Sequence, residues 1–186
     1  MKRLAAIVCF VLLLTGCSTA EENLNRAMAL RAKLLKAAGC SFDAEVTANY
    51  GDISYTFSMH CSTDEQGNLR FSVTEPKTIA GISGTVSATG GKLTFDDKVL
   101  AFQLMADGLV TPVSAPWLLI KTLRSGYLTS CGQEGAYLRL SVDDSYADDA
   151  LHLDIWLGEG DLPVQGEILW KGRRLLSIRV ENFTFL

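Results

Sequence analysis

Cysteine is the residue type whose spacing in this chain points most directly to chemistry. Five occur, and Cys40 and Cys61 bracket the stretch CSFDAEVTANYGDISYTFSMHC, in which apolar and polar residues alternate as in a half-buried β-strand. With Tyr50 and Gly51 as a two-residue turn, Cys40 faces Cys61 across a hairpin, close enough for a disulfide. The spacing therefore predicts a bridge between them. The alternatives are that Cys131 replaces one partner or that all three thiols stay reduced.

The first residues indicate the compartment in which such a bridge would form. Lys2 and Arg3 precede an apolar run that is too short to span a bilayer, the arrangement of a secretory signal. The run ends in the letters LTGC at positions 14–17, which look like a bacterial lipobox, whose cysteine is diacylated and becomes the first mature residue. An ordinary cleavable signal is the alternative. We expect an extracytoplasmic chain, anchored by diacylglycerol on Cys17 to the cell membrane, or to the outer membrane if the host has one.

The composition of the remaining chain limits its partners. Removing Lys2 and Arg3 leaves 15 basic residues against 21 acidic ones, a formal net charge of −6. This balance argues against nucleic acid and against a polybasic attachment to anionic lipid. No internal repeat or proline-rich linker divides the sequence. We expect a lipoprotein signal peptide at 1–16, a lipid anchor and amphipathic helix at 17–39, and one domain at 40–186.

Alternating segments after the anchor predict about ten antiparallel strands, each with one apolar face. A second helix is expected over 115–125, with Ser114 as its cap, Pro116 in its first turn and Gly126 at its end. Two helices cannot cover so many strands. We therefore predict a mainly β (α+β) fold in which a curved antiparallel sheet forms an unclosed β-barrel with helices on its concave side.

Turn residues and changes of alternation predict local register. A turn at Gly90–Gly91 would place Val86 opposite Phe95, and a three-residue turn at 170–172 would keep the apolar faces of the last hairpin together. The alternation slips near Glu181 or Asn182, which indicates a bulge. Several inward residues are small, and they allow either close helix contacts or empty apolar volume. These are Ala44, Ala48, Gly84, Ala88, Ala136 and Gly166.

No set of residue types points to catalysis, which needs a nucleophile with a base, a metal cluster or paired carboxylates. His60 and His152 both fall on polar strand faces, as solvent-facing histidines do. The acidic loop at 143–149 lacks the spacing of an EF-hand, and Cys131 has no histidine or cationic neighbour in sequence to activate it. We expect no enzyme activity, no metal and no cofactor.

These segments together resemble the LolA/LolB-type lipoprotein-carrier superfamily over nearly the whole mature chain. The resemblance lies in the lipidated start, the hairpin FDAEVTANY…YTFSMHC, the strand NLRFSVTEP, the hairpin GISGTVSATGGKLTF, the Pro-containing helix and the ending LPVQGEILWKGRRLLSIRVENFTF. It implies an unclosed barrel whose concave face holds acyl chains, with helices over its mouth. By that resemblance the hydrophobic ligand-binding residues would be Phe42, Val46, Tyr55, Phe57, Phe71, Val86 and Phe95, with Trp117, Leu118 and Ile120 on the covering helix.

Two features separate the sequence from the soluble carriers of that family. Soluble carriers are not lipidated, whereas the outer-membrane receptor is, and the strands here lack the distinctive arginine that the soluble carrier uses to latch its helices. Lipidated relatives include clostridial germination lipoproteins that bind a cortex-amidase partner. The resemblance thus implies two functions: a membrane-anchored, non-catalytic protein that binds acyl chains or lipidated proteins in an apolar concavity, or a cell-envelope interaction module that docks and supports a partner enzyme without a lipid ligand.

Overall fold

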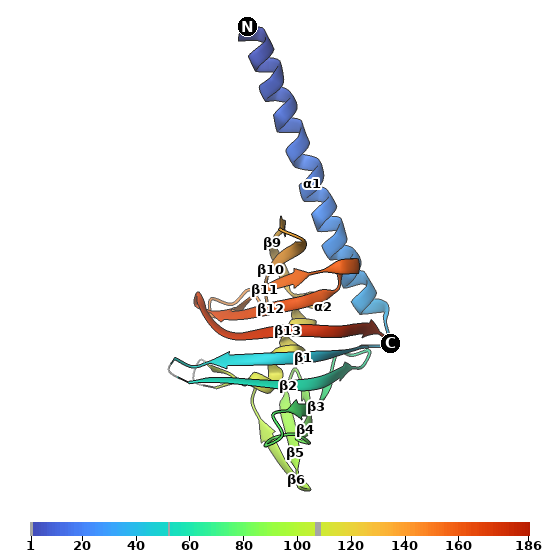
Figure 1. Ribbon diagram of the computed structural model, residues 1–186, viewed down its shortest axis with the longest axis vertical. Helices are drawn as coiled ribbons and strands as arrows, with labels where there is room; N and C mark the ends of the chain where they lie inside the picture. The colour runs from blue at the N-terminus through green and yellow to red at the C-terminus, as the bar shows by residue number, and fades with distance from the viewer. Residues whose placement is uncertain (1, 52, 107–108) are drawn as a thin grey trace.

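The computed structural model describes residues 2–51, 53–106 and 109–186, and for residues 2–18, 106 and 109 only the backbone. A long helix leads into a large sheet, and a second helix lies against that sheet (Figure 1). The elements follow one another as α1 (Lys2–Lys36), β1 (Cys40–Asn49), β2 (Ser54–Thr63), β3 (Leu69–Glu75), β4 (Ser83–Ser87), β5 (Gly90–Phe95), β6 (Lys98–Phe102), β7 (Met105–Ala106), β8 (Leu109–Val110), η1 (Pro112–Ser114), α2 (Ala115–Ser125), β9 (Tyr127–Glu134), β10 (Tyr137–Asp143), β11 (Leu151–Leu157), η2 (Glu159–Asp161), β12 (Pro163–Trp170) and β13 (Arg173–Phe185).

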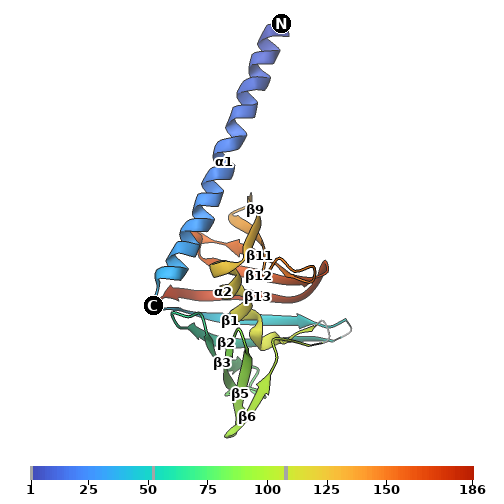
Figure 2. The same cartoon turned by 180° about the vertical axis from the view of Figure 1, so that it is seen from behind.

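Eleven of the strands form one sheet in the order β6-β5-β4-β3-β2-β1-β13-β12-β11-β10-β9, while β7 and β8 pair separately. The paired strands of the described chain all run antiparallel. The first and last strands, β1 and β13, pair in the middle of the sheet. The end strands β6 and β9 are not paired with each other, so the curved sheet stays open. Seen from behind, α2 lies across the concave side (Figure 2). The predicted fold class, a mainly β unclosed barrel with helices, is confirmed.

Alternation along the strands places the core on the concave side. In β1, Phe42, Ala44 and Val46 are at most 1% exposed, whereas Glu45 between them faces solvent. Helix α2 supplies the opposing wall, where Leu119 and Ile120 are fully buried. Burying apolar area on both walls is the main favourable term in holding such layers together.

The hairpin of β1 and β2 corrects the predicted cysteine register. Phe42, and not Cys40, lies opposite Cys61, because the connection comprises residues 50–53 and Tyr50 turns inward, where its hydroxyl donates to Val110 O at 2.8 Å. The main-chain N–H of Cys40 donates to Thr63 Oγ1 at 3.0 Å. A shift of two residues keeps every side chain on its predicted face, since side chains alternate with period two. Because of this shift, Cys40 and Cys61 are no longer directly opposite each other, which was the basis for predicting a disulfide between them.

Two other predicted turns are also wrong. The chain between β4 and β5 turns at Ala88 and Thr89, so Val86 lies opposite Gly91 and not Phe95. Gly91 is required by packing, because a Cβ there would collide with the ring of Phe102. The β12–β13 hairpin has a two-residue turn at 171–172, and its parity is restored by a register shift beyond the turn.

The predicted slip near the C-terminus is confirmed. The register of β1 against β13 shifts between Ser41 and Asp43, and Asn182 has a φ of 53°. A left-handed residue at a register shift is one recognised form of bulge, and asparagine tolerates this conformation better than most side chains.

Both predicted helices are present, with differences at their ends. The first runs from Lys2 to Lys36 and buries Ala27, Leu30 and Leu34, while Leu24 and Met28 are 45% and 46% exposed. Among the described residues no helix combines the length and apolar character needed to cross a membrane.

The second helix, α2, has Ser114 and Gly126 at its cap positions and Pro116 in its first turn, as predicted. The Ser114 hydroxyl does not cap the helix, however, and donates instead to Thr111 O at 2.6 Å.

Candidate functional site

The residues predicted to line a ligand cavity lie mainly in the packed interior. Tyr55 and Phe95 are exceptions, at 55% and 48% exposure. The other eight are at most 8% exposed and belong to one hydrophobic cluster: Phe42, Val46, Phe57, Phe71, Val86, Trp117, Leu118 and Ile120. Side chains so fully covered are in contact with protein atoms on nearly every side. The structure therefore brings these eight together as a core, in which α2 occupies the concave side.

The small inward residues show how α2 fits there. The position that a Cβ on Gly166 would occupy is 3.1 Å from Leu119 Cδ1, and Ala44 and Ala48 are at most 1% exposed. Small inward residues allow either close contact with a helix or empty apolar volume. At Gly166 the structure shows close contact with a helix. Sequence alone could not separate them because both need small side chains.

Arg31 and Arg124 form hydrogen bonds between α1 and α2. Neither contact was predicted from the sequence. From α1, Arg31 Nε donates to Leu123 O and Nη2 donates to Gly126 O, each at 2.8 Å, at the C-terminal end of α2. From α2, Arg124 Nη1 donates at 2.8 Å to Leu34 O near the end of α1. Each cation thus satisfies carbonyls that the other helix leaves unpaired. Burial lowers the pKa of Arg31. In the sequence, the only feature that could have predicted its contact with α2 was its position in the last turns of an amphipathic helix.

Part of the concave face extends beyond the cover of α2. Leu93 on β5 lies opposite Leu100 on β6, in the cross-strand row that continues through Gly84 to Phe71. Leu100 is 65% exposed and Phe95 is 48% exposed. Val99, on the opposite face of β6, is 66% exposed. Strand β6 thus presents apolar side chains on both of its faces, and β5 presents them on its concave face.

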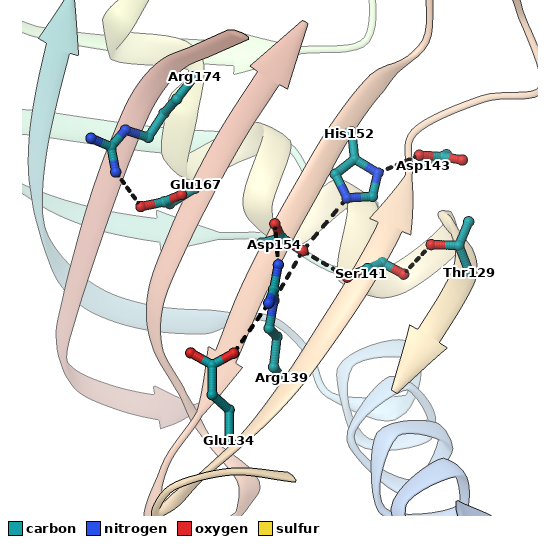
Figure 3. A network of polar contacts seen from close by, with 9 residues as sticks. All are labelled: Thr129, Glu134, Arg139, Ser141, Asp143, His152, Asp154, Glu167 and Arg174. Carbon is teal, nitrogen blue, oxygen red and sulfur yellow. Dashed lines mark hydrogen bonds and ion pairs between the residues drawn. The ribbon is translucent and has the colours of Figure 1, made fainter. Parts of the chain in front are cut away.

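A polar network covers the convex side of β9 to β13 (Figure 3). Asp154 is at its centre: it accepts hydrogen bonds from Arg139 Nη2 at 2.8 Å and from Ser141 Oγ at 2.6 Å. Burial would raise the pKa of Asp154, but these hydrogen bonds and the charges of Arg139 and His152 together lower it. Arg139 and Ser141 on β10 both donate to this carboxylate on β11, so the group ties the two neighbouring strands together.

Both histidines lie on the polar convex side, as predicted, and each has an aspartate directly opposite on the neighbouring strand. His60 Nδ1 is 2.8 Å from Asp43 Oδ1, and His152 Nδ1 is 2.7 Å from Asp143 Oδ1. Hydrogen bonds from Asn182 and His60 lower the pKa of Asp43. These cross-strand pairs account for the histidines as surface residues of the sheet.

Shallow hollows on the convex side are mainly polar. One of about 180 Å³ lies over β1, β2, β3 and β13, and one of about 220 Å³ lies between β1, β12 and β13. Glu45 and Arg179, directly opposite each other on β1 and β13, line both. A third, of about 370 Å³, includes Arg139 and Ser141. None of these three hollows is lined by the residues predicted to hold a ligand.

The remaining predictions about the site concern the state of the cysteines and the absence of a metal. Cys40, Cys61 and Cys131 are free thiols, and burial raises the pKa of each, which for Cys131 outweighs the opposing effect of Arg26. Among the residues that the structure describes, no three histidine, cysteine or acidic groups come together as a metal site. The side chain of Cys17 lies outside the described part of the chain, so its lipidation stays a prediction.

Comparison with known proteins gives likeness in fold. No family model matches the chain, and no curated protein matches it. Among solved structures, a putative outer membrane lipoprotein-sorting protein domain from Vibrio parahaemolyticus is 12% identical, with a TM-score of 0.49 over 89% of this chain and 93% of that chain. A LolA superfamily protein from Nitrosomonas europaea is 8% identical, with a TM-score of 0.45 over 90% and 94%. The fold of this chain is similar to that of these two structures.

A further similar structure is the complex of the CwlD amidase with the GerS lipoprotein from Clostridioides difficile. The match is 12% identical, with a TM-score of 0.43 over 86% of this chain and 93% of that chain. At such identities and scores the likeness concerns the arrangement of strands and helices, and ligand and partner must be argued from the residues of this chain.

Proposed function

We propose that this protein is an extracytoplasmic, membrane-anchored and non-catalytic module that docks a protein partner of the cell envelope. A diacylglycerol on Cys17 would hold it at the membrane surface, since two acyl chains give stable attachment. Helix α1 would then connect the anchor to the sheet domain.

The observation that supports docking over lipid carriage is the filling of the concave side by α2. Trp117, Leu118 and Ile120 are at most 6% exposed, and Leu119 packs closely against Gly166. An acyl chain could enter this interior only if α2 moved away, which would break the hydrogen bonds of Arg31 and Arg124 and expose the core to water. A domain whose core is already complete has its outer surfaces and sheet edges available for a partner.

The proposal is tested by purification from cells. The full chain with a C-terminal affinity tag is expressed in its own host, crosslinked in intact cells and purified from detergent-solubilised membranes. Wild type is compared with Cys17→Ser, which cannot be lipidated. We expect one protein partner to co-purify with wild type and to remain bound to Cys17→Ser when the two are mixed in solution, because the contacts are between protein surfaces.

Absence of any stoichiometric partner from wild type would contradict the proposal. So would a partner retained only by the lipidated form, because that partner would be held by the membrane. Cys9→Ser is the matched control, since this cysteine lies in the predicted signal peptide and its loss should leave anchoring unchanged.

Acyl-chain binding is the second candidate, favoured by the uncovered apolar strip at Phe95 and Leu100 on the concave face. Each buried methylene would contribute about 0.8 kcal/mol. Native mass spectrometry of the purified protein separates the two functions. An additional lipid on most molecules, beyond the modification of Cys17, would favour carriage and contradict docking as the main role.

A further inference from the structure

Strand β6 is an edge of the sheet with no cover. It is the last strand in the sheet order, and Lys98, Val99, Leu100 and Ala101 are all exposed. The other edge strand, β9, lies in contact with α1. Figure 1 places β6 at the end of the molecule opposite the start of α1, away from the predicted anchor. Proteins usually protect such an edge, because its free N–H and C=O groups can pair with another strand.

The turn before β6 determines which main-chain groups point outward. Asp96 and Asp97 both have positive φ, 46° and 61°, and Phe95 pairs with Lys98. A two-residue turn of this type closes with a hydrogen-bonded pair, after which hydrogen-bonded and non-hydrogen-bonded pairs alternate. Leu100 is two residues further along and therefore directs its N–H and C=O toward Leu93 on β5. Val99 and Ala101 direct theirs to the open edge, where no described residue accepts or donates.

The charge around this edge differs from that of the whole chain. Arg70, Lys92 and Ala101 share one cross-strand row on the convex face, through Thr85. Both cations are exposed, and neither has a hydrogen bond or ion pair among the described residues. Arg70 and Lys92 therefore form a small basic surface on the convex face inward of β6, while Asp96 and Asp97 lie in the turn at the start of this strand.

We propose that β6 is the docking edge for the protein partner, which adds one antiparallel strand to the sheet. This inference rests on the proposed docking function and names its surface. The added segment would exchange hydrogen bonds with Val99 and Ala101, as in other strand-addition complexes. The partner residue opposite Leu100 is apolar, because that side chain shares the concave face with Leu93 and Phe95. The partner residue opposite Ala101 is acidic, because it shares a cross-strand row with Lys92 and only the small side chain of Ala101 lies between them.

Proline substitution tests which main-chain N–H groups of β6 point away from β5 to the open edge. Ala101→Pro removes an N–H that points to solvent, whereas Leu100→Pro removes one bonded to β5. We expect Ala101→Pro to keep the melting temperature of the full chain close to that of wild type, and Leu100→Pro to lower it clearly. Equal destabilisation by the two would overturn the assignment of Val99 and Ala101 to the open edge.

Binding is measured with a fluorescein-labelled, end-blocked peptide of sequence Thr-Glu-Leu-Val-Thr, which carries the acidic and apolar positions in antiparallel order. We expect saturable binding to the detergent-solubilised full chain at low ionic strength. Ala101→Pro should weaken it by at least about tenfold. A peptide with lysine in place of glutamate should also bind more weakly. No saturable binding to the folded wild type, or equal binding to Ala101→Pro, would overturn the inference.

The same variant separates failure of this inference from failure of the proposed function. In the crosslinking experiment, loss of the partner from folded Ala101→Pro supports β6 as the docking edge. A partner retained equally by wild type and Ala101→Pro would leave the docking function in place and overturn its assignment to β6. Absence of a partner from wild type would overturn both.

Discussion

At the scale of single residues, Asp154 shows how a charged group is stabilised on the convex face. Its side chain is 9% exposed and accepts hydrogen bonds from Arg139 and Ser141. Because its pKa is lowered in the folded protein, Asp154 stabilises the fold above the unfolded pKa of about 3.9, and this contribution is lost as the pH falls through the folded value. Stability should therefore decline in acid partly through this residue.

We predict that Asp154→Asn lowers the free energy of unfolding at pH 7 by about 1–3 kcal/mol, the range for hydrogen bonds to charged groups. The difference from wild type should begin to narrow below about pH 3.9, where the carboxyl becomes protonated in the unfolded chain, and should narrow further as the pH falls through the lower pKa of the folded protein. Urea unfolding at a series of pH values measures both effects. Asp149→Asn, in an exposed loop, is the control and should change neither. A constant difference at every pH would show that the ion pair is not the cause.

The cysteines provide a second test at this scale. We predict three reactive thiols after denaturation in protein that is processed as proposed, with Cys9 removed and Cys17 acylated, and purified without reductant, because Cys40, Cys61 and Cys131 are free. Before denaturation only Cys131 should react, since Cys40 and Cys61 are at most 1% exposed and burial raises the pKa of both thiols. A colorimetric thiol assay counts them. One thiol in the denatured protein would instead support the bridge predicted from the sequence.

At the scale of elements, the contact between α1 and α2 depends on a reciprocal exchange of arginines. We predict that Arg31→Met, which loses two hydrogen bonds to carbonyls of the α2 end, lowers the free energy of unfolding by about 1–3 kcal/mol. Hydrogen exchange should also become faster in the C-terminal half of α1. Lys33→Met, exposed on the same helix, is the matched control. Unchanged exchange in Arg31→Met would mean that the two hydrogen bonds of Arg31 do not hold the helix in place.

At the scale of the whole molecule, the question is whether the concave side is filled or hollow. We predict that Gly166→Val destabilises the protein by about 1–3 kcal/mol, because added atoms would meet Leu119 of α2 and well-packed cores tolerate extra volume poorly. The control is Gly132→Val, a strand position where an added Cβ meets nothing within 4 Å. Chemical unfolding compares the two. A neutral effect of Gly166→Val would indicate free space beneath α2, and would favour acyl-chain binding.

The sequence by itself determined the elements and their faces. Alternation of period two predicted the inward residues of β1 and β2, and it kept them correct although the register was wrong by two, since a shift of two leaves every side chain on its face. Ser114, Pro116 and Gly126 likewise located α2, because caps and breakers act locally. The bulge near Asn182 was visible as a slip in the same alternation.

Only the tertiary structure decided how these elements meet. The inward turn of Tyr50 moved Cys40 away from Cys61, the Phe102 ring explained Gly91, and Arg31 and Arg124 found carbonyls far away in sequence. Whether small residues such as Gly166 border a cavity or a helix was also decided by packing. Local pattern cannot predict such contacts, because they depend on distances between segments that the sequence does not encode in its periodicity.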